Sequence, residues 1–102
     1  APDEAVVMAG YVYILANRKN GALYTGVTAD LAARMMQHKA GEGSKFCREY
    51  GVDKLVYIEA ADAIEDAIAR EKAIKKWRRA WKIELIERDN SDWRDLFFDL
   101  NR

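Results

Sequence analysis

The chain has 102 residues, half of them hydrophobic and a third charged, so we expect one compact domain with its own apolar core. A single cysteine, Cys47, rules out an internal disulfide, makes a cysteine-rich zinc site implausible and favours a reducing, cytoplasmic location. The net charge is zero, the apolar runs are short and acidic residues stand near the start, which argues against a membrane protein, a secreted protein and a globally basic one.

The first expected element is a β-hairpin. Residues 1–9 are interpreted as an N-terminal extension or a remnant of cloning, so the fold is expected to begin at residue 10. Residues 10–15 and 23–27 are aromatic and β-branched, and the turn-prone residues 17–21 between them end in Asn-Gly, which suits a hairpin loop. Alternation along the first strand assigns one face to Tyr11, Tyr13 and Leu15 and the other face to Val12 and Ile14.

A helix is expected next. Thr28-Ala29-Asp30 offers an N-cap, apolar residues recur at helical spacing from Leu31, and Gly41 supplies a residue that ends a helix. Arg34 and His38 are four residues apart and therefore share one helix face, close to the stripe that packs on the sheet. Residues 41–51 are rich in glycine and polar residues, which predicts an exposed, mobile loop containing Lys45.

The rest of the chain predicts one strand, at residues 54–60, and three helices. The first helix runs from Asp62 to about residue 77, the second covers residues 79–88 with Trp81 and Leu85 facing inward, and a last short helix is capped by Ser91 and contains Trp93, Leu96 and Phe97. The expected fold is α/β (α+β), a small three-stranded antiparallel sheet flanked by helices. Residues 10–88 form the domain, and residues 89–102 form a helical tail packed on it.

Glu71 interrupts the apolar stripe of the long helix. At 3.6 residues per turn the inner face of this helix takes Ile64, Ala67, Ile68, position 71 and Ile74. A carboxylate on such a face needs a specific partner, because an unpaired buried charge is strongly unfavourable. The partner is either a cation or a basic side chain, and Arg34 and Lys75 are candidates for a purely structural ion pair.

Tyr11, Tyr13 and Tyr24 are expected to form an exposed tyrosine cluster on the hairpin, beside the helix that carries Arg34 and His38. Clustered tyrosines are usually core aromatics with hydroxyls at the edge, and a lone histidine is more often structural than catalytic. Taken together with Glu71, however, these side chains supply a phosphate clamp, proton-transfer groups and a metal ligand, which are the parts of a phosphodiesterase.

The same residues, in the same order, resemble the GIY-YIG nuclease superfamily. Tyr11-Val12-Tyr13 and Tyr24-Thr25-Gly26 stand for its two triplets, and Arg34, His38 and Glu71 follow. The resemblance covers most of the chain, from about Gly10 to Arg79, and is greatest to small stand-alone bacterial members, in which a segment like EKAIKKW follows the glutamate. The sequence departs from the family pattern at two points. Tyr11 replaces the glycine of the first triplet, and the late asparagine of many members has no clear counterpart, with Asn90 as the only candidate.

The resemblance implies a divalent-metal-dependent endonuclease that cleaves DNA, with catalytic residues Tyr13, Tyr24, Arg34, His38 and Glu71. It implies that Glu71 binds one cation, for which Mg²⁺ or Mn²⁺ suits an oxygen ligand, and that Arg34 holds the scissile phosphate. The two tyrosines would position and deprotonate the attacking water, with His38 orienting or relaying the proton. We favour Tyr13 as the base, although a phenol with a reference pKa of about 10 needs help from nearby positive charge.

Basic residues are concentrated on the later helices: seven stand between Arg70 and Lys82, against one acid. Such a run is often only a solvated helix face. The candidate contacts to a nucleic-acid backbone are Lys45, Lys72, Lys75, Lys76, Arg78 and Arg79. The expected partner is DNA of unspecified structure, with RNA as an alternative, and a protein partner is a possible source of targeting. The competing hypotheses are a non-catalytic nucleic-acid- or partner-binding module that retains the fold, and a Glu71 that pairs with Arg34 for stability alone.

Overall fold

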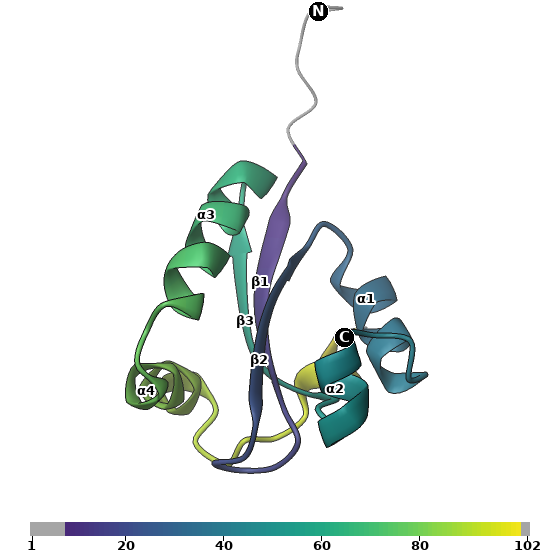
Figure 1. The fold of residues 1–102 in the computed structure, drawn as a ribbon. Helices are drawn as coiled ribbons and strands as arrows, with labels where there is room; N and C mark the ends of the chain where they lie inside the picture. The colour runs from purple at the N-terminus through teal and green to yellow at the C-terminus, as the bar shows by residue number, and fades with distance from the viewer. Residues whose placement is uncertain (1–7, 101–102) are drawn as a thin grey trace, which may run out of the picture.

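Three strands form an antiparallel sheet, as predicted, and their order in the sheet is β2-β1-β3. Strand β1 (Gly10–Ala16) is central, and β2 (Leu23–Thr28) and β3 (Lys54–Ala61) are the edges. Helices α3 (Ile64–Lys75) and α4 (Arg79–Asp89) lie on one side of the sheet, and α1 (Leu31–Lys39) and α2 (Lys45–Tyr50) lie on the other (Figure 1). The computed structural model describes residues 8–100, so residues 1–7 of the expected N-terminal extension lie outside the described part.

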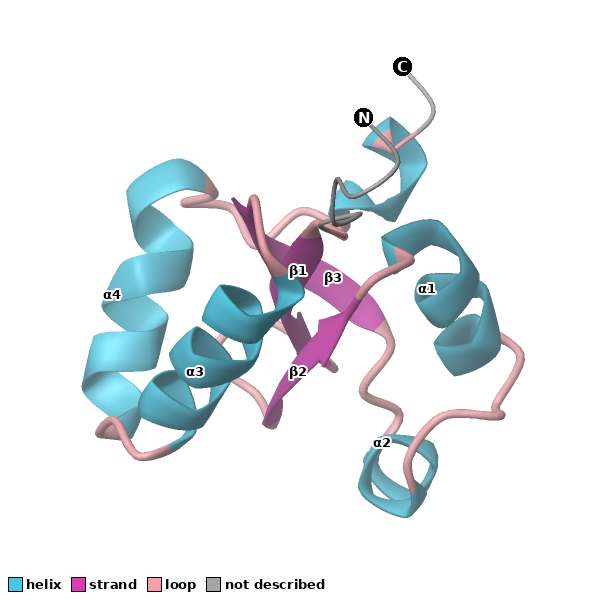
Figure 2. Ribbon diagram, turned by 90° about the horizontal axis from the view of Figure 1, so that it is seen from above, coloured by secondary structure: helices cyan, strands magenta, loops and turns pink. Residues whose placement is uncertain are grey.

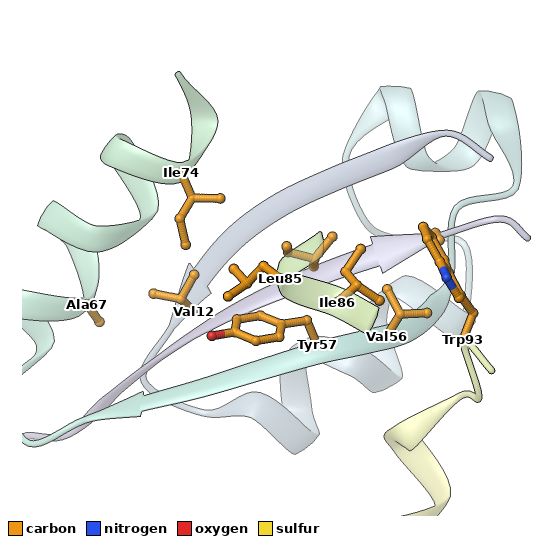
Figure 3. Packing of buried hydrophobic residues seen from close by; sticks show 10 residues of the cluster. Val12, Val56, Tyr57, Ala67, Ile74, Leu85, Ile86 and Trp93 are labelled. Carbon is orange, nitrogen blue, oxygen red and sulfur yellow. The ribbon is translucent and has the colours of Figure 1, made fainter. Parts of the chain in front are cut away.

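Strand β1 contributes to two hydrophobic cores, because its alternate side chains point to opposite faces of the sheet. Val12, Ile14 and Ala16 pack toward α3 and α4, and Figure 3 shows Val12 near Tyr57 and Leu85 in this core. On the opposite face, Tyr13 and Leu15 pack with Leu31, Met35, Cys47, Val52 and Leu55. The assignment of the two faces from the sequence is therefore confirmed.

The hairpin register brings the two triplets together. Tyr13 pairs with Gly26 and Leu15 pairs with Tyr24. Since directly opposed residues point to the same face, Tyr13 and Tyr24 share the α1 side of the sheet. The connecting loop uses Asn20 at φ 59°, a left-handed conformation that asparagine tolerates better than most residues.

Local capping residues define the helices of the α1 side. Asp30 caps α1, as predicted, by accepting a hydrogen bond from the Ala33 N–H. The prediction of a loop across residues 41–51 is wrong, because six of these residues form α2. Ser44 caps α2 by accepting from the Cys47 N–H, and Gly51 ends it in the left-handed conformation. Lys45 therefore lies in the first turn of a helix and not in a mobile loop.

Four further expectations are wrong in detail. Helix α3 begins at Ile64 and not at Asp62, and its residue Ile68 is 38% exposed, so Ile68 does not belong to the buried stripe. Trp81 is 49% exposed, whereas Leu85 does face inward. At the C-terminus the last helix is a 3-10 helix, Leu96–Asp99, and Asp95 caps it in place of Ser91.

The segment that follows α4 packs back onto the sheet. Trp93 is buried with φ 56° in the connection, and the 3-10 helix contacts β3. Asp95 ties this segment down: one carboxylate oxygen accepts from the Leu55 N–H, and the other lies 2.6 Å from Lys39 Nζ. None of the helices between residues 8 and 100 combines the length and apolarity that a membrane crossing requires.

Candidate active site

Three aromatic rings meet on the α1 side of the sheet. The ring centroid of His38 lies 5.9 Å from that of Tyr13 and 5.8 Å from that of Tyr24, and the two tyrosine rings are 6.5 Å apart. Strand β2 supplies Tyr24 at an edge of the sheet, which Figure 2 shows between α3 on one side and α1 on the other. Three of the five predicted catalytic residues therefore form one contiguous cluster.

Tyr13 and His38 are linked inside this cluster. The Tyr13 hydroxyl oxygen lies 3.3 Å from His38 Nε2, and the histidine tautomer decides which of the two groups donates the hydrogen bond. The expectation of an exposed tyrosine cluster is wrong for Tyr13, which is 1% exposed, whereas Tyr11 and Tyr24 are only half-buried. His38 is buried as well, so the pair forms the inner wall of the site.

Gly26 makes room for the Tyr13 hydroxyl. A Cβ at position 26 would lie 2.4 Å from Tyr13 Cζ and 2.4 Å from its Oη, well inside van der Waals contact. In the sequence, Gly26 stands only as the last residue of the second triplet, with no predicted role of its own. Its function follows from the cross-strand pairing of residues 13 and 26, which places the glycine against the ring.

The environment of the cluster raises the pKa of Tyr13 and lowers the pKa of His38. Burial, followed by the Tyr24 charge, raises the pKa of Tyr13 far above its usual value. The positive charge of Arg34 lowers this pKa, and the negative charge of Glu71 raises it. Burial and the Arg34 charge lower the pKa of His38, with Asp53 opposing. Near neutral pH both groups are therefore uncharged in the free protein.

Arg34 lies on the exposed side of α1, one helical turn before the buried His38. The two residues share a helix edge, as their spacing predicted, yet only His38 packs against the sheet. Because Arg34 affects the pKa of both Tyr13 and His38, we infer that its guanidinium lies within electrostatic reach of the cluster. An exposed guanidinium is chemically suited to bind an anion.

Glu71 is buried on α3, in the stripe where periodicity placed it, and is 8% exposed. Of the two candidate partners, the structure pairs it with Lys75, whose Nζ lies 2.7 Å from Glu71 Oε2. This hydrogen bond raises the pKa of Lys75. The Lys75 side chain is half exposed, so its ammonium can move into solvent and be replaced by another cation without a change of fold.

The carboxylate of Glu71 fits a cation that keeps most of its water. Among residues 8–100, no three His, Cys, Asp or Glu side chains gather in a way that could hold a metal, so this part of the chain forms no closed cage of protein ligands. Mg²⁺ is usually bound through one or two carboxylates, with water and substrate oxygens completing the shell. The single carboxylate of Glu71 is compatible with this kind of coordination.

The six basic residues expected to contact nucleic acid are exposed but are not equivalent. Arg79 donates to the carbonyl oxygens of Asn20 and Gly21, which fastens α4 to the hairpin loop. Lys75 pairs with Glu71, and Arg78 stacks over the Trp81 ring at 5.3 Å. Lys72 and Lys76 lie on and directly after α3, and Lys45 lies on α2 across the sheet.

Asn90 does not join the cluster. It is buried, donates to the carbonyl oxygens of Val56 and Arg94, and accepts from the Arg94 N–H. Its neighbour Val56 belongs to the core on the α3 and α4 side, whereas Tyr13 belongs to the core on the other side. Asn90 thus organises the connection after α4.

Comparison with known sequences identifies the family to which this chain belongs. The family model described as the GIY-YIG catalytic domain matches residues 9–84, which include the whole sheet, α1, α2 and α3. The chain therefore belongs to the GIY-YIG family, a family of nuclease-type hydrolases.

Within this family the chain is similar to UPF0213 proteins. It is 38% identical over 80 residues to the one from Syntrophus aciditrophicus, covering 78% of this chain and 91% of the relative. It is 45% identical over 76 residues to one from Clostridium perfringens, with coverage of 74% and 81%. The solution NMR structure of a UPF0213 protein from Bacillus halodurans is 34% identical and superimposes with a TM-score of 0.54, over 86% of this chain and 93% of that one.

Proposed function

We propose that this protein is a divalent-metal-dependent endonuclease that hydrolyses DNA phosphodiester bonds in the cytoplasm. The observation that carries the proposal is the Tyr13–His38–Tyr24 cluster on the α1 side of the sheet, where the charges of Arg34 on α1 and Glu71 on α3 both affect the pKa of the buried phenol. Membership of a nuclease family supports the same reading. The free, buried thiol of Cys47 is consistent with a reducing compartment.

Each side chain has a role that its position allows. Glu71 would hold one Mg²⁺ or Mn²⁺, which supplies positive charge to the phosphate oxygens when bound. Arg34 binds the scissile phosphate from the α1 side and stabilises the negative charge that develops on it. Tyr24, half-buried at the strand edge, helps to orient the attacking water, and His38 holds the Tyr13 hydroxyl.

Tyr13 is the proposed general base. Because Tyr13 starts as a phenol, its hydroxyl proton first passes to His38 Nε2, 3.3 Å away. The water proton then passes to the phenolate oxygen as the water oxygen forms its bond to phosphorus and the bond to the leaving oxygen breaks. In the free protein Tyr13 is protonated because burial raises its pKa, and the Glu71 charge adds to this effect. A cation on Glu71 would remove one of the smaller causes of the raised pKa, and Arg34 already lowers it, so both act toward the phenolate and against the larger effect of burial.

The exposed lysines of α3 would bind the phosphate backbone without reading bases. Lys72 and Lys76 are the strongest candidates, since Arg79 and Lys75 already have partners within the fold. Affinity that rests on such contacts should fall steeply with salt concentration, because each phosphate contact releases condensed counterions. A flat salt response would place the nucleic acid elsewhere.

One observation favours a second candidate function, a nucleic-acid- or partner-binding module without catalysis. The Glu71–Lys75 ion pair satisfies the carboxylate inside the protein, which is what a purely structural glutamate would also show. The endonuclease and the binding module differ in the role of Glu71 when a metal cation takes the place of Lys75. Cleavage that depends on Glu71 supports the enzyme, whereas binding that is indifferent to Glu71 supports the module.

The test is a cleavage assay on single-stranded, duplex and branched DNA and on RNA, with Mg²⁺, Mn²⁺ or EDTA. Arg34→Ala and Glu71→Ala should abolish cleavage while the circular dichroism spectrum stays that of the wild type. Gln37→Ala and Glu65→Ala are matched controls, because both residues are exposed on the same helices. Binding without cleavage of any substrate, together with an inert Glu71→Ala change, would establish the binding module instead.

A further inference from the structure

Two tryptophans line a hollow beside the end of α3. Trp77 follows this helix and is half-buried under the Arg70 guanidinium at 5.1 Å, and Trp81 stands in the first turn of α4 and is 49% exposed. Their rings meet edge to face with centroids 6.3 Å apart. The buried Leu85, one turn further along α4, completes the apolar part of this hollow of about 170 Å³. The tryptophan hollow therefore offers the Trp81 ring to a ligand.

Two opposite charges complete the lining of the tryptophan hollow. Glu84 and Arg88 both line it from α4, one helical turn apart, and both are exposed. Neither side chain has a hydrogen bond or an ion pair within the part of the chain that the structure describes, residues 8–100. A carboxylate can accept a hydrogen bond from a ligand, and a guanidinium can donate one to a carbonyl oxygen or a ring nitrogen. The hollow thus combines an apolar wall with an unused acceptor and an unused donor.

The chain around the tryptophan hollow is suited to a polyanion. From residue 76 to residue 82 it carries no acid and four basic residues, which are Lys76, Arg78, Arg79 and Lys82. The Arg78 guanidinium already stacks over the Trp81 ring at 5.3 Å, which shows that this ring accepts a planar polar group. Proteins bind single-stranded nucleic acid through the same combination, with cations on the phosphates and aromatic rings under the bases.

The tryptophan hollow lies near the proposed metal ligand. Glu71 stands one turn, about 6 Å, before the end of α3 at Lys75, and Trp77 follows two residues later. Lys82 Nζ donates to the Lys75 carbonyl at 3.4 Å, which joins the start of α4 to the end of α3. Figure 2 shows α4 turning back beside α3 at this end. A strand that leaves Glu71 along the last turn of α3 therefore meets the tryptophans next.

We propose that the tryptophan hollow binds one unpaired nucleobase of the nucleic-acid substrate. The base stacks on the Trp81 ring in place of the Arg78 guanidinium, which moves to a neighbouring phosphate. Glu84 and Arg88 contact the edge of the base, where every nucleobase carries both a donor and an acceptor. A paired base cannot enter, because its faces are stacked and its edge is occupied. The preference for a substrate with unpaired nucleotides beside the cleaved bond rests on the proposed function, whereas binding of the base does not.

Binding is tested in EDTA, so that no cleavage occurs, and at one fixed salt concentration. The probes are a short single-stranded DNA, the same sequence as RNA, a blunt DNA duplex and an abasic DNA strand that keeps the phosphates but lacks the bases. Trp81→Ala should weaken binding of the two base-containing single strands by about 10-fold, the scale of one lost stacking contact, and should change the affinity for the duplex and the abasic strand by less than about twofold. Tyr50→Ala, which removes an exposed aromatic ring of α2, is the matched control.

Trp81→Phe gives a second measurement that does not depend on a large truncation. The base-containing strands should quench the tryptophan fluorescence of the wild type, the abasic strand should not, and Trp81→Phe should lose most of the quenching. Equal affinity for the base-containing and abasic strands, or unchanged binding in Trp81→Ala, overturns the proposal and leaves the hollow to a protein partner or to solvent. Failure to bind any of the probes overturns it as well.

Cleavage separates this inference from the proposed function. In the nuclease, Trp81→Ala should raise KM for single-stranded DNA by about 10-fold and leave kcat within about twofold, because the base is held away from the cleaved bond. Wild-type protein that binds the base as described but cleaves nothing refutes the proposed function alone. Wild-type protein that cleaves DNA with no response to Trp81→Ala refutes the nucleobase site alone.

Discussion

Glu71→Gln is the substitution that best separates a catalytic from a structural carboxylate. The change keeps the shape of the side chain and removes its charge. Glutamine can still accept a hydrogen bond from Lys75 through its amide oxygen, so the contact at 2.7 Å is weakened but not replaced by a cavity. What the variant loses is the negative charge that a cation would bind.

The structure sets a low limit on the stability that this charge provides. The Glu71–Lys75 pair is an i,i+4 pair whose lysine side chain is 50% exposed, and pairs of this kind contribute roughly 0.3–0.5 kcal/mol. Removing a buried charge also relieves its desolvation, which acts in the opposite direction. We therefore expect Glu71→Gln to change the free energy of unfolding by less than about 1 kcal/mol, or about 4–8 °C in Tm at most.

The loss of catalytic activity in Glu71→Gln should be much larger than its loss of stability. Loss of the carboxylate that holds the cation should lower kcat/KM by about 10²-fold or more at saturating Mg²⁺, a loss of transition-state stabilisation of about 3 kcal/mol. Thermal unfolding and cleavage are measured on the same preparation, with the exposed Glu65→Gln on the same helix as the control. Full activity in Glu71→Gln, or a Tm that falls by more than about 10 °C, would refute the reasoning and favour a structural glutamate.

Three further predictions address other parts of the molecule. Gly26→Ala should destabilise the fold by about 1–3 kcal/mol, measured by urea unfolding, because its Cβ would overlap the buried Tyr13 ring; an unchanged midpoint would contradict that contact. Burial opposes ionisation of Glu59, but hydrogen bonds from Arg70 and from the Tyr57 hydroxyl hold its pKa in the folded protein below 4.5. The ionised Glu59 therefore contributes to stability above pH 4.5, and this contribution is lost as the pH falls through the lowered pKa of the folded protein. Glu59→Gln should accordingly flatten the loss of stability below pH 4.5, and an acid-unfolding curve parallel to that of the wild type would count against the pair. Lys76→Gln should reduce the slope of log affinity for duplex DNA against log salt by about 0.9, and no change would remove this lysine from the interface.

Periodicity predicted the parts of the fold that depend on a repeating environment. The alternation in β1 gave the correct face for Tyr13, and the helical stripe of α3 gave the burial of Glu71 before any relative was considered. Both predictions succeeded because each side chain on a strand or helix must face either the core or the solvent. The same reasoning failed for Trp81, because apolar spacing does not distinguish a core residue from a surface one that stacks with Arg78.

Features that depend on contacts between distant segments could not be predicted from the sequence pattern. Helix α2 is too short for a periodic signal, although Ser44 and Gly51 at its ends were local cues. The choice of Lys75 over Arg34 as the partner of Glu71 depends on where two helices lie across the sheet. The tryptophan hollow likewise depends on how α4 turns back beside the end of α3, which spacing alone does not specify.

The central position of β1 also has a consequence for motion. Its backbone is hydrogen-bonded to β2 on one side and to β3 on the other, so the amide of Tyr13 should exchange with solvent only through global unfolding, whereas α2 should open locally. The phenol therefore belongs to a segment that we expect to fluctuate little, while Arg34 is a long side chain exposed at the surface. A phosphate bound as proposed would therefore meet a hydroxyl in a fixed position on one side and a mobile guanidinium on the other.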